Sequence, residues 1–142
     1  MTKQEESLIS ELIKDYLNSK RIFNRRNQAI ATSYGLPDRE FLYKGVNVGI
    51  EVKTSTGTAK AHQKHKLKQF NDNGGVGVVV RSVDEVKFII KLIDDYYDIY
   101  IENCYSLDSM SILLHLDREK PWLTIPNYVR ENFNREYPKN NV

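Results

Sequence analysis

Residues 46–53 have the sequence Val-Asn-Val-Gly-Ile-Glu-Val-Lys, in which branched apolar residues alternate with polar or small ones. This period of two predicts a β-strand with one face in the core, because successive side chains of a strand point to opposite faces. The valines and the isoleucine are therefore predicted to face the core, while Glu51 and Lys53 share the opposite face.

The neighbouring segments indicate that this strand lies inside a sheet. Residues 40–43 read as a strand joined to 46–53 by Lys44-Gly45, a dipeptide that fits a tight hairpin turn. Residues 76–80 form a continuous apolar run, which is typical of a strand buried on both faces. A charged face on a central strand needs an explanation, because buried charges are costly without partners or a metal ion.

The other patterns complete a mixed α/β order. Apolar residues recur at helical spacing in three segments, and Asn73-Gly74-Gly75 is a good stop for the second of these helices. The third begins at Ser82, with Glu85 positioned for a capping box. The predicted elements are a helix at 5–18, strands at 22–27, 40–43 and 46–53, a helix at 60–73, a strand at 76–80 and a helix from 82 to about 95. The first six of these elements have the order αβββαβ, which predicts an α/β fold with a mixed central sheet flanked by helices.

Beyond Tyr96 the patterns are weaker. Residues 106–117 fit either a helix or a strand with a turn, 127–137 fit a terminal helix, and 138–142 are predicted to be a frayed tail. Three tyrosines in this part of the chain are predicted either to pack in the fold or to form an oligomer surface, namely Tyr96, Tyr97 and Tyr100.

Composition excludes several classes of protein. The chain has 142 residues, 40% hydrophobic and 28% charged, with no apolar run that approaches a transmembrane span. Its N-terminus lacks the apolar core of a signal peptide, and its single cysteine, Cys104, excludes an internal disulfide framework and a cysteine-based zinc site. We therefore expect a cytoplasmic protein with no membrane partner. A net charge of +2 is too small to indicate nucleic-acid binding by itself.

Asp38 provides a second carboxylate in addition to Glu51 of the strand. It follows Pro37, whose ring restricts the backbone. Two carboxylates that converge with one ammonium group are suited to metal-assisted hydrolysis of phosphodiesters. In this interpretation Asp38, Glu51 and the Val52 carbonyl hold Mg²⁺, or Mn²⁺ in its place. Lys53 then lies beside the attacking water. In the alternative interpretation, Asp38 is only a turn residue and the strand charges form a solvated edge.

The spacing of Pro37-Asp38 and Glu51-Val52-Lys53 resembles the PD-(D/E)XK nuclease superfamily. A wider string resembles its VRR-NUC branch, and archaeal-type Holliday junction resolvases share much of the layout. The string consists of Arg25, Asn27, Gly35, Pro37, Asp38, residues 50–54, Gly57 and Gln63. The resemblance covers residues 5–95 and implies a restriction-endonuclease-like core, Mg²⁺-dependent endodeoxyribonuclease activity and a DNA substrate. Residues 1–97 are predicted as the nuclease core. Residues 98–142 are predicted as an extension packed on the same domain, which contributes DNA or oligomer contacts.

Gln63 is a further candidate catalytic residue. It lies on the helix face that buries Leu67 and Phe70, so it is predicted to point toward the cleft. Alternatively, it bonds a loop carbonyl. The resemblance implies that Gln63 helps to position the site.

The resemblance also implies a third carboxylate from the first helix. Glu6 fits the family register best and is the predicted ligand. Glu5 lies nearer the centre of the apolar face, and Glu11 projects away from that face.

Cations mark a candidate phosphate-binding surface. The outward side of the 60–73 helix carries Lys60, His62, Lys64, His65, Lys66 and Lys68. Together with two arginines of the first strand, they predict a nucleic-acid-binding set, the alternative being a solvated lysine-rich face. The predicted set is Arg25, Arg26, Lys60 and Lys64.

Three functions fit this sequence. The first is a metal-dependent DNA endonuclease that acts on branched or junction DNA. The second is a sequence-specific homing or restriction endonuclease of the same fold, and the third is a non-catalytic DNA-binding module. Because cutting both strands needs two sites, a homodimer or higher homo-oligomer is expected.

Overall fold

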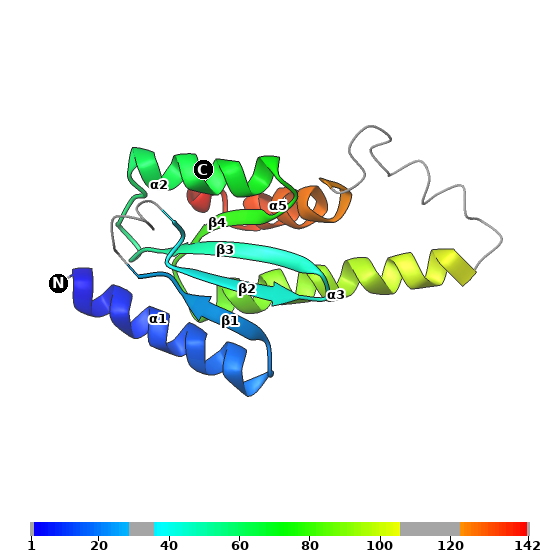
Figure 1. The fold of residues 1–142 in the computed structure, drawn as a ribbon, viewed down its shortest axis with the longest axis horizontal. Helices are drawn as coiled ribbons and strands as arrows, with labels where there is room; N and C mark the ends of the chain where they lie inside the picture. The colour runs from blue at the N-terminus through cyan, green and yellow to red at the C-terminus, as the bar shows by residue number, and fades with distance from the viewer. Residues whose placement is uncertain (1, 29–35, 106–122, 142) are drawn as a thin grey trace.

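The computed structural model describes residues 2–28, 36–105 and 123–141, and its elements follow the predicted order (Figure 1). They are α1 (Thr2–Ser19), β1 (Phe23–Arg26), β2 (Arg39–Tyr43), β3 (Val46–Val52), α2 (Ala61–Asp72), β4 (Val76–Val80), α3 (Val83–Tyr105), α5 (Thr124–Glu136) and the 3-10 helix η3 (Pro138–Asn140). The mixed α/β class and the αβββαβ order are confirmed. No helix in the described part of the chain is both long and apolar enough to cross a membrane.

The sheet has four strands in the order β1-β2-β3-β4. β1, β2 and β3 are antiparallel neighbours, while β3 pairs with β4 in parallel and places Glu51 opposite Val79. At the β2–β3 turn, φ is 47° for Lys44 and 80° for Gly45, and a two-residue type I′ turn requires positive values at both positions. The predicted hairpin is therefore present, and β3 is an interior strand as predicted.

The two faces of β3 meet different layers. Its apolar residues Val48, Ile50 and Val52 join one buried cluster with residues of α1 and α3, such as Ile13 and Ile89. The opposite face meets α2, which lies across the sheet from α1 in Figure 1. Glu51 and Lys53 are on this second face, beneath α2, and both are buried.

Glycines let α2 lie close to the sheet. A Cβ atom on Gly77 would lie 2.4 Å from the Leu67 carbonyl oxygen, and one on Gly49 would lie 3.0 Å from the Phe70 ring. Asn71 of α2 also satisfies the outer edge of β4, because its side chain accepts the Gly77 N–H at 2.7 Å and donates to the Gly77 carbonyl at 3.3 Å. The close approach of α2 brings its first turn within reach of the charged face of β3.

Two predictions about the C-terminal third were wrong. The third helix was expected to end near residue 95, but α3 continues to Tyr105. Tyrosines stabilise this extension, since the Tyr96 ring lies 5.2 Å from that of Tyr128 and the Tyr97 hydroxyl donates to the Lys44 carbonyl. These contacts assign Tyr96 and Tyr97 to packing.

The tail predicted to fray instead forms η3. Asn140 of this turn is 2% exposed, and its side chain donates to Glu85 Oε1 at 2.7 Å. A buried carboxamide with a charged partner holds the chain end in place. Residues 106–117, and the side chain of Tyr100, lie outside the described residues. The division at residue 97 stays a prediction, although α3 runs across it.

Candidate active site

Asp38 lies at the end of β3. This residue directly precedes β2 in the chain. Its Oδ2 atom accepts a hydrogen bond from the Val52 backbone N–H at 2.9 Å. The N–H and C=O groups of one strand residue leave the strand on the same side, so the Val52 carbonyl also faces the side where Asp38 lies. The Val52 carbonyl of the predicted site therefore lies on the same side of β3 as the first carboxylate.

Gln63 connects α2 to the second carboxylate. Its Nε2 atom donates to Glu51 Oε1 at 2.7 Å, while its Oε1 atom accepts the Lys60 backbone N–H at 2.8 Å at the start of α2. Lys53 Nζ lies 3.8 Å from the same Glu51 oxygen. Gln63 thus points toward the charged face of β3, as predicted, and is held at both ends of its amide.

The surroundings of Glu51 change its protonation. Burial raises the pKa of Glu51 to about 8, and the charge of Asp38 and a hydrogen bond with it act in the same direction. Lys53 opposes this increase, while Glu6 adds to it. Near neutral pH, without a bound cation, Glu51 therefore retains a proton beside Asp38. A cation held between the two carboxylates would replace that proton.

The donor set suits Mg²⁺ or Mn²⁺. Two carboxylates and a main-chain carbonyl are hard oxygen donors, and Mg²⁺ is commonly held by one or two carboxylates together with water. Glu6 faces the same groove as Asp38 and Val52. Within residues 2–28, 36–105 and 123–141, however, no three His, Cys, Asp or Glu side chains are grouped closely enough to hold a metal ion. The assignment of Glu6 as a ligand stays a prediction.

A groove of about 900 Å³ runs between α1 and the β1–β2 strands and reaches Asp38. Five cations line it, namely Lys3, Lys14, Arg25, Arg26 and Arg39. Arg25 also forms an ion pair with Glu40, with Nη2 3.1 Å from Oε2. Because anionic polymers bind in clefts lined by cations, this groove is a candidate path for a phosphodiester backbone. We call it the α1–β1 groove.

Arg39 was missed from the sequence. It is buried, its Nη1 atom donates to Asn24 Oδ1 at 2.7 Å, and burial lowers its pKa below the usual value. A signal was available, because Arg39 falls on the core-facing side of β2, directly after Asp38. A cation at an inward position of a strand is unusual without a partner or a role.

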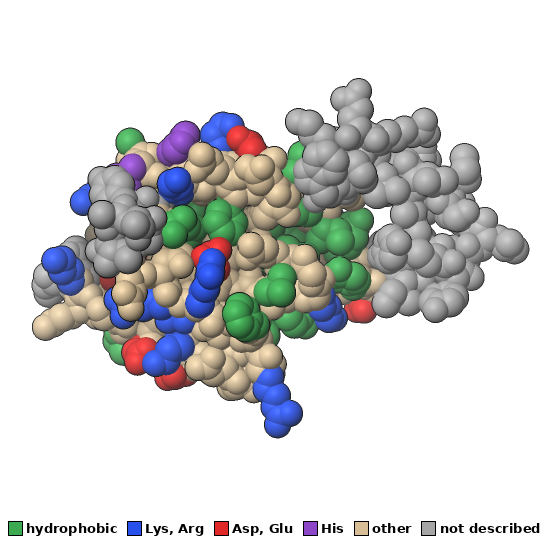
Figure 2. Space-filling view, in the orientation of Figure 1, with side chains coloured by type: hydrophobic (Ala, Val, Ile, Leu, Met, Phe, Trp, Pro, Cys, Tyr) green, Lys and Arg blue, Asp and Glu red, His purple; other side chains and the backbone are tan. Residues whose placement is uncertain are grey.

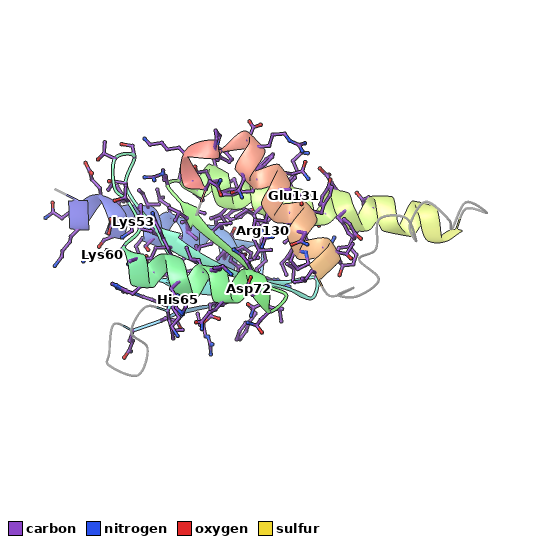
Figure 3. The ribbon with its side chains drawn as sticks, turned by 90° about the horizontal axis from the view of Figure 1, so that it is seen from above. Lys53, Lys60, His65, Asp72, Arg130 and Glu131 are labelled. Atoms are coloured by element: carbon purple, nitrogen blue, oxygen red, sulfur yellow. The ribbon has the colours of Figure 1, made fainter. Side chains whose placement is uncertain are left out.

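The structure divides the predicted nucleic-acid-binding set. Arg25 and Arg26 line the α1–β1 groove, whereas Lys64 lines a separate groove between α2 and α5. Lys60 is exposed at the start of α2, near Lys53 in Figure 3. The role of all four residues in binding stays a prediction.

Arg81 holds the loop that follows Lys53. Its Nη1 atom donates to the carbonyls of Thr54 and, at 2.6 Å, of Gly57, while its Nε atom donates to Asn140 Oδ1 at 2.7 Å. These contacts join the loop after Lys53, the end of β4 and η3. No local sequence pattern indicates such a network, because its members are far apart in the chain.

Arg81→Lys should destabilise the protein. An ammonium group cannot reproduce the guanidinium fork, so the carbonyls of Thr54 and Gly57 lose donors, at a cost of about 2 kcal/mol of unfolding free energy. Urea unfolding would measure this loss. Arg135→Lys, at an exposed position of α5, is the control. Unchanged stability in Arg81→Lys would contradict the structural role of Arg81.

These elements define a restriction-endonuclease-like α/β domain. Its central strand carries the charged pair Glu51 and Lys53, and Asp38 and a cation-lined groove lie beside that strand. A solved structure described as a VRR_NUC domain has a similar fold, with a TM-score of 0.54 and 22% sequence identity. The match covers 61% of this chain and 95% of that chain. It confirms the predicted resemblance to the VRR-NUC branch at the level of the fold. No family model matches the chain, and no curated protein matches it.

Proposed function

We propose that this protein is a metal-dependent DNA endonuclease that hydrolyses phosphodiester bonds in branched or junction DNA. The observation that carries the proposal is the convergence of Asp38, Glu51 and the Val52 carbonyl at the end of β3, next to the cation-lined α1–β1 groove. The VRR_NUC-like fold supports it. We further propose that a homodimer or higher homo-oligomer supplies the two sites needed to cut two strands.

Each residue has a distinct task in this proposal. Asp38, Glu51 and the Val52 carbonyl hold the cation, and Gln63 fixes the orientation of the Glu51 carboxylate. When bound, Mg²⁺ supplies a water of lowered pKa and positive charge beside the scissile phosphate. Lys53, which is buried against Glu51, orients the attacking water or neutralises charge on the phosphate.

The groove lining suits contact with a nucleic-acid backbone. Besides its charged residues and Val52, the groove is lined by the small polar side chains Ser7, Ser10, Asn18, Asn24 and Asn27. Cations, hydroxyls and carboxamides are the groups that commonly contact phosphate and sugar oxygens in nucleic-acid complexes. A sequence-specific homing or restriction endonuclease of the same fold is the second candidate, with base-reading elements elsewhere in the chain.

Cleavage of a DNA panel in Mg²⁺ tests the proposal. The panel contains four-way junctions, flaps and random linear duplexes, each labelled on every strand in turn. Selective nicking of junctions or flaps is the expected result. One discrete cut site in linear duplex would favour the sequence-specific enzyme, and binding of every substrate without any cleavage would contradict nuclease function.

A further inference from the structure

A second groove, of about 440 Å³, lies between α2 and α5 at the β4 edge of the sheet. Its described lining is Ala61, Lys64, His65, Lys68, Asn71, Asp72, Gly77, Arg130, Asn134 and Asn141, and none of these residues lines the α1–β1 groove. Figure 3 shows Arg130 of α5 and Asp72 of α2 between the two helices. We call this surface the α2–α5 groove.

The cations of α2 in this groove are not explained by the fold. Lys64 and Lys68 are four residues apart, and like charges at that spacing destabilise a helix. Figure 2 shows Lys and His side chains gathered over α2 at the top of the view. Lys68 is offset by Asp72, with Nζ 2.7 Å from Oδ2. An anionic ligand would offset the repulsion that remains.

The other two cations of the groove, Lys64 and Arg130, form no ion pair with a carboxylate of the described residues. Across the described part of the chain, no salt bridge includes Lys64 or Arg130. Arg130 Nη2 donates instead to the neutral carboxamide of Asn127, at 2.8 Å. Two helices thus direct cations into one groove and leave them available to a ligand.

The position of the groove connects it to the proposed active site. Gln63 of α2 contacts Glu51, and Lys64 is the next residue, so the groove begins beside the site. From there α2 leads away at about 1.5 Å per residue, which separates Lys64 from Lys68 by about 6 Å. The two grooves lie on opposite flanks of the sheet, one beyond β1 and the other along β4. These two strands are three interstrand spacings apart, or about 14 Å.

We infer that the α2–α5 groove binds the phosphate backbone of a second nucleic-acid segment, apart from the strand that enters the α1–β1 groove. This inference rests on the proposed function, since it takes DNA as the substrate. A branched DNA offers two backbone segments to one protein surface, and the two grooves receive one each.

Affinity measurements with a double variant test this inference. Lys64→Ala combined with Arg130→Ala is compared with Lys66→Ala combined with Arg135→Ala, which removes the same two charges from the same two helices outside the groove. Fluorescence anisotropy in Ca²⁺ would measure binding of a labelled four-way junction and of a short linear duplex. The groove variant should bind the junction at least about tenfold more weakly, and its salt slope should fall by about 1.8 for two phosphate contacts.

The outcomes separate this inference from the proposed function. A loss confined to the junction and to the groove variant supports a second binding segment. An equal loss in the control variant, an equal loss on the short duplex, or no loss at all would overturn it. Cleavage of the junction in Mg²⁺ by the unaltered protein is scored independently. Absence of cleavage alongside the junction-specific affinity loss would contradict the endonuclease but leave the second groove supported.

Discussion

Glu51→Ala and Lys53→Ala are each expected to abolish DNA cleavage in Mg²⁺ while most of the DNA affinity persists. Glu51 is a proposed cation ligand and Lys53 acts beside the scissile phosphate, so each affects the transition state more than the bound substrate. Loss of such a group reduces kcat by about 10³-fold or more. Affinity persists because the cations of the α1–β1 groove are unchanged. Single-turnover cleavage and anisotropy on the same labelled junction would measure both quantities.

Both side chains are buried, so folding must be controlled. Glu51→Gln keeps the shape of the protonated side chain, and Lys53→Met keeps most of the apolar stem. Lys91→Ala, on the exposed side of α3, removes a charge far from β3 and should cleave normally. If the alanine variants of Glu51 and Lys53 both still cut in Mg²⁺, the assignment of the active site is wrong.

Without divalent cations, the free energy of unfolding should fall as the pH rises from about 4.5 to about 8. The folded protein raises the pKa of Glu51 from its usual 4.5 to about 8, so in this interval the native state binds a proton that the unfolded state has released. Stability is therefore fully present below pH 4.5 and is lost as the pH approaches 8. The loss amounts to a few kcal/mol, because each pKa unit corresponds to about 1.4 kcal/mol. Urea unfolding across this interval measures it.

Two comparisons assign this slope to Glu51. Glu51→Gln should be nearly independent of pH in the same interval, since an amide does not titrate. Added Mg²⁺ should flatten the slope in the unaltered protein, because the cation binds the deprotonated pair and stabilises the native state. Asp94 cannot cause the slope, since its pKa is lowered and its contribution is lost only in acid. A slope that survives in Glu51→Gln would contradict this account.

Most of the fold was predictable because its patterns are local. The period of two in β3 and the apolar run of β4 placed two neighbouring strands, and Lys44-Gly45 placed the hairpin between β2 and β3. The C-terminal third was less predictable because distant contacts hold it. The Tyr97 hydroxyl of the α3 extension donates to the hairpin turn between β2 and β3. The Asn140 side chain holds η3 in place by donating to Glu85.

The candidate site shows the same division. Asp38 was recognised by its spacing from Glu51, and Glu51 and Lys53 by their common strand face. Helical spacing directed Gln63 toward them. Their catalytic roles stay predictions. Arg81 carries no comparable pattern, because its partners come from a loop and a chain end that only folding brings together.

By itself, the sequence determined the order of the elements, the face of β3 that carries charge and the chemistry those charges allow. These properties follow from residue type and short-range spacing, which act before the chain is packed. Only the tertiary structure decided which cations act together. Lys64 and Arg25 were predicted as parts of one surface, yet they line two grooves on opposite flanks of the sheet. It also decided the protonation of Glu51, because burial beneath α2 and the approach of Asp38 set that pKa.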